Sequence, residues 1–252
     1  MKETYPLLNE EYGEFHIALD KRIEYIIRKG FIAKVYSLLF IQLIITFSFV
    51  FLSLEIKSLQ LFLTYHFWIY IINVIIPFII LIYFTVKPKK AKQVPINYIL
   101  LFIFCFSEGY TIARFVIGFK KQSVYFTLIL TLIAVLALSL YAYKTKKNFT
   151  LLGGSLFISL MIILLGSIIN IFFRIKLLNF ILTVVAIILF SIYIIYDTQL
   201  IIGNKEYKLS EEDYIKAAIN LYIDIITLFI DILSLLGNRK RKIVIKNNLK
   251  IY

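Results

Sequence analysis

The chain has 252 residues, of which 61% are hydrophobic, and its mean hydropathy is +0.87. Such values exclude an ordinary soluble globular domain, so the sequence predicts an all-helical protein whose main partner is the lipid bilayer. The net charge of +13 does not indicate a nucleic-acid partner, because the basic residues fall in short connectors between apolar runs, where Lys and Arg mark membrane topology.

Seven apolar runs are long enough to cross a membrane as helices. Their approximate limits are Val35–Leu54, Tyr65–Val86, Ile96–Ile117, Val124–Tyr143, Leu151–Phe173, Leu177–Ile202 and Tyr214–Leu236. The expected fold is a bundle of about seven transmembrane helices over residues 30–236. We expect residues 1–29 to form a short cytosolic tail with one amphipathic turn near Lys21–Arg28, and residues 237–252 to form a basic C-terminal tail.

The distribution of Lys and Arg predicts the orientation of the bundle. Counted through Lys176, the N-terminal tail and the connectors expected on its side hold thirteen basic residues, against six in the alternate connectors, which favours a cytosolic N-terminus. The basic residues after Gly237 conflict with this pattern, because seven full spans place them on the opposite side. Two explanations stay open: the last run is re-entrant, or helix packing overrides the charge rule.

Two consecutive apolar runs each carry an aspartate at a depth where the bilayer disfavours charge. Asp197 and Asp224 lie about 8 Å and about 14 Å below the same membrane face, at about 1.5 Å per helical residue. A buried acid costs at least a few kcal/mol, so it usually faces a bundle interior or a water path. Because the two runs are antiparallel and share a short connector, we expect the two aspartates to come within reach of each other.

Three kinds of function place paired carboxylates in a membrane. In an ion pathway the pair is a gate that responds to pH, because two acids in one site cannot both ionise cheaply, and two carboxylates suit a transient calcium site better than tight storage. An intramembrane aspartyl protease also uses two aspartates, and Tyr196-Asp197 fits one of its motifs, but its Gly-x-Gly-Asp and Pro-Ala-Leu motifs are missing here. In a non-conducting scaffold or receptor, the acids only lock helices together.

Four further charged residues are candidates for lining a pore or pairing helices: Glu108, Arg114, Asp231 and Lys87. Glu108 lies well inside the third run, in a functional or a structural role. Arg114, near the end of that run, either snorkels to the surface or pairs with Asp231, which lies two turns beyond Asp224. Lys87, at the cytosolic end of the second run, either reaches toward Asp197 or anchors in the headgroups.

The sequence around both aspartates also resembles a known family. The matching residues are Tyr196-Asp197-Thr198-Gln199-Leu200, Gly203-Asn204, Glu212-Asp213-Tyr214-Ile215, Leu221-Tyr222, Asp224-Ile225-Ile226 and Leu228-Phe229, with Ser107-Glu108-Gly109-Tyr110-Thr111 and Lys146-Lys147-Asn148-Phe149-Thr150 earlier in the chain. They resemble the signature of the transmembrane Bax inhibitor motif family, and among its branches the lifeguard and Golgi anti-apoptotic proteins. The resemblance covers roughly residues 28–238.

The resemblance implies a helical bundle with the last helix near its centre, resident in the Golgi or endoplasmic reticulum. It implies a calcium leak from the store that opposes cell death, with Asp197 and Asp224 as the pH sensor and calcium as the permeating ion. Apoptosis-regulating membrane proteins are the protein partners that it suggests, and neither an enzyme activity nor a tightly bound cofactor follows from it. Asp231 departs from the family motif as an extra acid.

The predicted orientation can be tested at a glycosylation sequon, Asn148-Phe149-Thr150, in the basic connector that holds Lys144 and Lys147. This connector is expected in the cytosol, so Asn148 should carry no glycan when the protein is expressed in eukaryotic cells. Enzymatic deglycosylation followed by a gel-mobility assay measures this directly. A glycan on Asn148 would reverse the predicted orientation.

Overall fold

The computed structural model describes residues 4–240, and side chains from Phe15 onward. The elements in chain order are α1 (Thr4–Glu55), α2 (Lys57–Tyr65), α3 (Phe67–Val86), α4 (Pro88–Ala91), α5 (Ile96–Val116), α6 (Lys121–Lys144), η1 (Phe149–Leu152), α7 (Gly153–Phe173), α8 (Lys176–Ile202), η2 (Glu211–Asp213) and α9 (Tyr214–Leu236). Within the described residues the fold is helical, and the β-structure found there is a single bridge between Phe119 and Arg239.

The predicted seven-helix membrane bundle is confirmed. In the part of the chain that the structure describes, seven helices are long and apolar enough to cross a membrane, namely α1, α3, α5, α6, α7, α8 and α9. Each contains one of the predicted apolar runs nearly from end to end. About 20 consecutive apolar residues are needed to cross the bilayer core as a helix. Because lipid offers no hydrogen-bond partners, the backbone of such a run must pair within its own helix, so the apolar runs and the helices coincide. The protein is therefore a multi-pass membrane protein.

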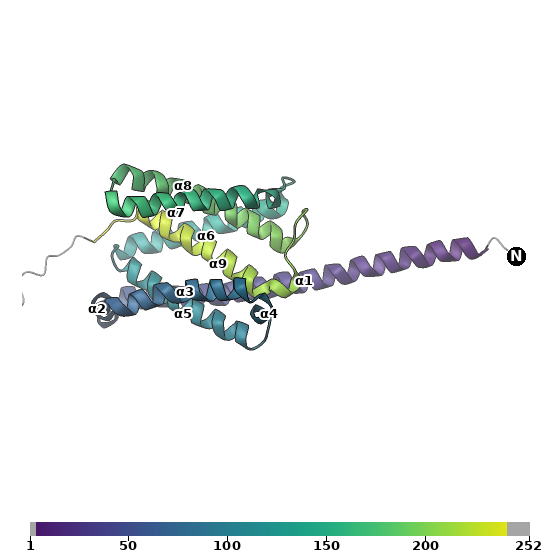
Figure 1. The fold of residues 1–252 in the computed structure, drawn as a ribbon, viewed down its shortest axis with the longest axis horizontal. Coiled ribbons are helices and arrows are strands. Elements are labelled where there is room, and N and C mark those ends of the chain that lie inside the picture. Colours follow the sequence, from purple (N-terminus) through teal and green to yellow (C-terminus); the bar gives the residue numbers. More distant parts are fainter. Residues whose placement is uncertain (1–3, 241–252) are drawn as a thin grey trace, which may run out of the picture.

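The last helix lies at the centre of the bundle, as expected. In Figure 1, α9 runs between α7 and α8 on one side and α1, α3 and α5 on the other. Within its apolar window 56% of the residues are buried, against 44% or less in the other spans. Its largest fully buried side chains include Tyr222, Phe229 and Leu228, which contribute to the main apolar core.

The first helix is longer than the sequence predicts. α1 continues without interruption from Thr4 to Glu55, so the segment expected as a tail with one amphipathic turn is helical over its described part. At about 1.5 Å per residue, a helix of 52 residues is about 78 Å long, more than twice the thickness of a bilayer core. Its N-terminal part therefore projects beyond the bundle, as Figure 1 shows.

The basic connectors gather at one end of the bundle, which we call the α8–α9 end because the connector between those helices lies there. Lys205 of that connector donates to the carbonyl of Thr145, and Lys92 pairs with Glu212 at 3.1 Å and Asp213 at 3.3 Å. The hydrogen bond to Glu212 raises the pKa of Lys92, which favours its charged form. The opposite end, called the α7–α8 end, holds Arg174, and the basic residues from Arg241 onward lie outside the described residues.

Arg28 of α1 fastens the α8–α9 connector to the rest of the bundle. Its guanidinium, which is almost fully buried, donates to the carbonyls of Leu200, Ile202 and Leu209 and pairs with Glu211 at 3.1 Å. These carbonyls include those that the C-terminus of a helix leaves unpaired. Gly203 closes α8 at φ 72°, and a side-chain carbon there would come within 2.6 Å of the guanidinium, so the glycine permits this approach.

We expect Arg28→Gln to destabilise the protein by about 3 kcal/mol, because buried carbonyls lose a charged donor. For a chain of this size that corresponds to a fall in Tm of about 6–12 °C, measured by thermal unfolding in detergent. Lys29→Gln is the matched control, because Lys29 is exposed and adjacent. Equal Tm values for the two variants would contradict the role given to Arg28.

Candidate functional site

The two aspartates predicted to meet do lie together in the centre of the protein. Asp197 comes from the last turns of α8 and Asp224 from the middle of α9, and the two helices pack antiparallel. Their carboxyl groups are within hydrogen-bonding reach of each other, and they are only 5% and 6% exposed. Among the described residues, Oδ2 of Asp224 has no hydrogen-bond donor.

This arrangement has a simple chemical consequence. Two carboxylates side by side in an apolar interior repel each other when both are charged, and each lacks the water that normally solvates it. One shared proton converts the repulsion into a hydrogen bond between the two groups. The contact between α8 and α9 is thereby linked to the protonation of Asp197 and Asp224.

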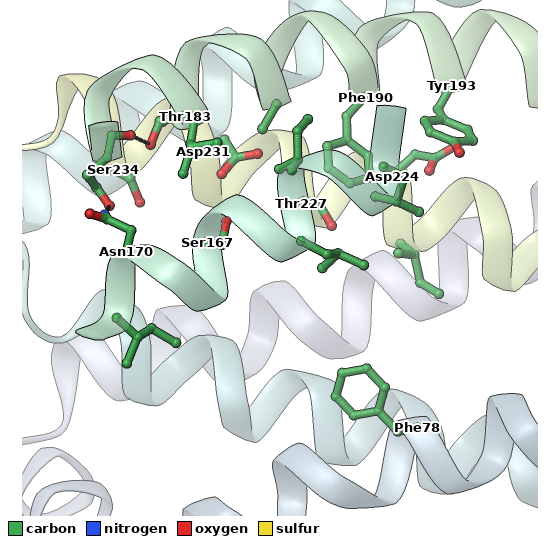
Figure 2. Close-up of a pocket in the computed structure, with 18 of the residues that line it drawn as sticks. Phe78, Ser167, Asn170, Thr183, Phe190, Tyr193, Asp224, Thr227, Asp231 and Ser234 are labelled. Atoms are coloured by element: carbon green, nitrogen blue, oxygen red, sulfur yellow. Dashed lines mark hydrogen bonds between the residues drawn. The ribbon is translucent and has the colours of Figure 1, made fainter. Parts of the chain in front are cut away.

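The charged and hydroxyl groups next to the pair come from α8 and α9. Lys216 of α9 acts electrostatically on Asp197 from the α8–α9 end, and the Tyr193 ring lies close to both carboxyl groups. Figure 2 shows Tyr193 beside Asp224. Lys87, which the sequence suggested as a partner of Asp197, instead lies over the ring of Tyr83, with Nζ 5.7 Å from its centroid, and is exposed. This position fits its alternative role as a headgroup anchor.

The pair opens onto a cavity of about 1270 Å³. Its walls are formed mainly by α7, α8 and α9, and it continues from Asp197 and Asp224 to Arg174, Lys176 and Arg239 at the α7–α8 end. Figure 2 shows its polar side chains, including Asp231 and Ser234 of α9 and Asn170 of α7. A cavity of this length can hold water where such polar side chains line it next to buried acids.

The two remaining candidate residues do not belong to this cavity. Glu108 is half-buried near Cys105 and Tyr222. Tyr222 is two residues from Asp224 on α9 and so points to roughly the opposite side of that helix. Arg114 lines a separate cavity of about 260 Å³ together with Phe67 and Phe119.

The ion pair predicted between Arg114 and Asp231 is not formed in the described part of the chain. Nε of Arg114 and Oδ2 of Asp231 are buried there without a hydrogen-bond partner. α5, which carries Arg114, packs chiefly against α1 and α3, whereas Asp231 faces the cavity between α7, α8 and α9. The two residues line different cavities, which share Arg239 at the α7–α8 end.

Sequence reasoning missed a polar stripe that lines this cavity. Five residues of α9 recur at alternating spacings of four and three and all line the cavity: Asn220, Asp224, Thr227, Asp231 and Ser234. That spacing keeps residues on one face of a helix. The signal was present in the sequence, as polar residues at helical spacing within an otherwise apolar run.

The arrangement gives no tight metal site. Among the side chains of residues 15–240 there is no group of three or more His, Cys, Asp or Glu residues that could hold a metal ion. Calcium prefers six to eight oxygen ligands, so two carboxylates with water can hold it only weakly.

Comparison with known proteins shows extended similarity. The family described as "Inhibitor of apoptosis-promoting Bax1" matches residues 28–241. Protein lifeguard 3 of Homo sapiens is 29% identical over 218 residues, covering 84% of this chain and 70% of the human protein. The Golgi anti-apoptotic protein of Vaccinia virus (strain Lister) is 32% identical over 224 residues, covering 86% and 88%. An uncharacterized protein of Campylobacter jejuni is 38% identical over 153 residues, covering 58% and 64%.

The carboxyl pair predicts an unusual response of stability to mutation. As the pH rises and the pair becomes doubly charged, Asp197→Asn or Asp224→Asn should raise Tm relative to the wild type, because either change removes one of the two repelling charges with almost no change of volume. The double variant should gain little more, with a coupling of about 0.5–3 kcal/mol between the two sites. Thermal unfolding of all four proteins in detergent measures this.

Glu206→Gln is the control for this cycle, because Glu206 is an exposed acid in the α8–α9 connector. It should leave Tm nearly unchanged. If the two single changes lowered Tm and their effects simply added, the aspartates would act independently.

Proposed function

The chain belongs to the family of inhibitors of apoptosis-promoting Bax1, and on that premise we propose that it is a pH-sensitive calcium leak channel that lowers the calcium of an intracellular store and inhibits apoptosis. The observation that carries the proposal is the contact between the buried carboxyl groups of Asp197 and Asp224 beside a large cavity that a row of polar side chains of α9 lines on one side. A pair that merely locked helices together would not need a cavity of about 1270 Å³ next to it.

The pair acts as a gate through its proton. With one proton shared, the two carboxyl groups hydrogen-bond and hold α8 against α9 at the α8–α9 end. When that proton leaves, the two charges repel unless a cation compensates them, and the path can then open to calcium. Calcium occupies the pair only transiently, because a carboxylate pair supplies too few ligands to retain it.

The intracellular membrane is proposed from the names of relatives. The Vaccinia virus relative is called a Golgi anti-apoptotic protein and aligns with 86% of this chain. We therefore place this protein in the membrane of the Golgi or the endoplasmic reticulum, with its α8–α9 end and its N-terminus in the cytosol. A calcium leak in that orientation moves the ion from the store toward the pair and then to the cytosol.

A second function, regulation of cell death through protein partners without conduction, is favoured by a different feature. The part of α1 beyond the bundle exposes large apolar side chains, among them Phe15 at 63%, Tyr25 at 66% and Ile26 at 58%. An exposed apolar helix outside the membrane is a surface that a partner protein can cover. Such a scaffold would not depend on the protonation of Asp197 and Asp224.

A flux assay decides between these two functions. Purified protein in liposomes should release calcium in a pH-dependent way, and Asp197→Asn or Asp224→Asn should each shift the pH midpoint by about one unit or more. The effects of the two changes should be non-additive in the double variant, because the sites are coupled. Glu206→Gln should match the wild type. If both single variants fold and their calcium flux depends on pH as in the wild type, the gate is rejected and the scaffold is favoured.

A further inference from the structure

The polar stripe of α9 extends well beyond the aspartate pair. From Asn220 to Ser234 it spans 14 residues, or about 21 Å along the helix axis, which is most of the thickness of a bilayer core. Of the residues in this stripe, the proposed gate uses only Asp224. Thr227, Asp231 and Ser234 lie farther toward the α7–α8 end, with no role in the contact between the carboxyl groups.

The opposite walls of the cavity are mainly apolar but carry some polar side chains along this stretch. Ser167 and Asn170 come from α7, and Asn179 and Thr183 come from α8. Figure 2 shows Thr183 and Asn170 on the walls of the cavity that Asp231 and Ser234 also line. Thr183 donates to the carbonyl of Asn179 at 2.8 Å, and Asn170 donates to the side chain of Asn179 at 3.5 Å. These wall residues therefore pair with one another, and the buried oxygens left unpaired along this stretch belong to α9.

Unpaired oxygen atoms show that the protein itself leaves these acids unsatisfied. Oδ2 of Asp231 is buried without a hydrogen-bond partner among the described residues, as is Oδ2 of Asp224, whose side chain is only 6% exposed. Both aspartates line the same cavity. A carboxylate in this position needs a cation or a donor from outside the protein.

We propose that Asp231, flanked by Thr227 and Ser234, forms a second position for a hydrated divalent cation in this cavity, between the aspartate pair and the α7–α8 end. It lies seven residues from Asp224, so the two positions are about 10 Å apart along α9. This inference deepens the proposed function, on which it rests: a calcium ion that enters from the α7–α8 end pauses at Asp231 before it reaches the gate.

Charge at the α7–α8 end explains why an acid is needed at this depth. Arg174, Lys176 and Arg239 line the end of the cavity beyond Ser234 and present positive charge to an entering cation. These side chains are exposed, so water and salt screen them, whereas Asp231 lies deeper, in surroundings of lower dielectric constant. The carboxylate therefore offsets the positive potential just inside the mouth.

Cysteine accessibility tests this position without relying on flux. Ser234→Cys places a thiol one turn from Asp231 on the same face, and the unmodified chain controls for Cys105, which is 1% exposed. With Asp231 present, a cationic methanethiosulfonate reagent should react about tenfold faster than an anionic one, and millimolar calcium should slow it. When Asp231→Asn is added, calcium should no longer slow the reaction, and the anionic reagent should react faster than the cationic one. The reason is that the electrostatic potential at the thiol is then set by the three basic residues.

Two results would overturn the proposal. The cavity holds no water if Ser234→Cys resists both reagents while the protein is folded. Asp231 holds no cation if the preference and the calcium effect are the same with and without Asp231→Asn. Should Ser234→Cys fail to fold, Thr227→Cys on the other side of Asp231 gives the same comparison.

Flux measurements separate this inference from the proposed function. In liposomes Asp231→Asn should lower calcium flux about tenfold at low calcium, Asp231→Glu should retain it, and Glu206→Gln should be neutral. Calcium protection of Ser234→Cys without wild-type flux would support the second position and reject the leak channel. The opposite result is wild-type flux that Asp231→Asn leaves unchanged, together with a Ser234→Cys thiol that calcium does not protect from the reagent. It would support the channel and reject the second position.

Discussion

The contact between two buried carboxyl groups is the constraint around which this bundle is built. Asp197 and Asp224 can face each other only if α8 and α9 pack closely and lipid is kept away from both. This requirement explains why the last helix lies at the centre of the bundle and is its most buried span. The other spans shield it, and much of their own surface is free to face lipid.

α9 packs into the apolar core with one side and lines the cavity with the opposite side. One side packs into the apolar core through Tyr222, whose hydroxyl also lies 2.7 Å from that of Thr46 in α1. The other side carries the polar stripe that faces the cavity. A helix with only an apolar surface would pack equally well but would offer no route for water or ions. In the proposed function the stripe lines the route of the ion, and the opposite face packs into the core.

The end of α8 near the pair is held by polar contacts, so a change at the pair can reach the connectors. Gln199, two residues from Asp197, accepts a hydrogen bond of 2.8 Å from the backbone of Phe149 and donates one of 3.0 Å to the carbonyl of Lys147. Arg28 binds the turn that follows. Movement of α8 relative to α9 thus requires these connector contacts to move or break.

The sequence by itself determined the class of protein, the seven spans and the meeting of Asp197 with Asp224, because the length of an apolar run and a helical rise of about 1.5 Å per residue fix depth in a membrane. Only the tertiary structure decided in which direction each side chain points around its helix axis. Arg114 and Asp231 have similar depth but face different cavities, and Lys216 rather than Lys87 acts on Asp197. Side-chain direction depends on which helices pack together, and spacing along one helix does not contain that information.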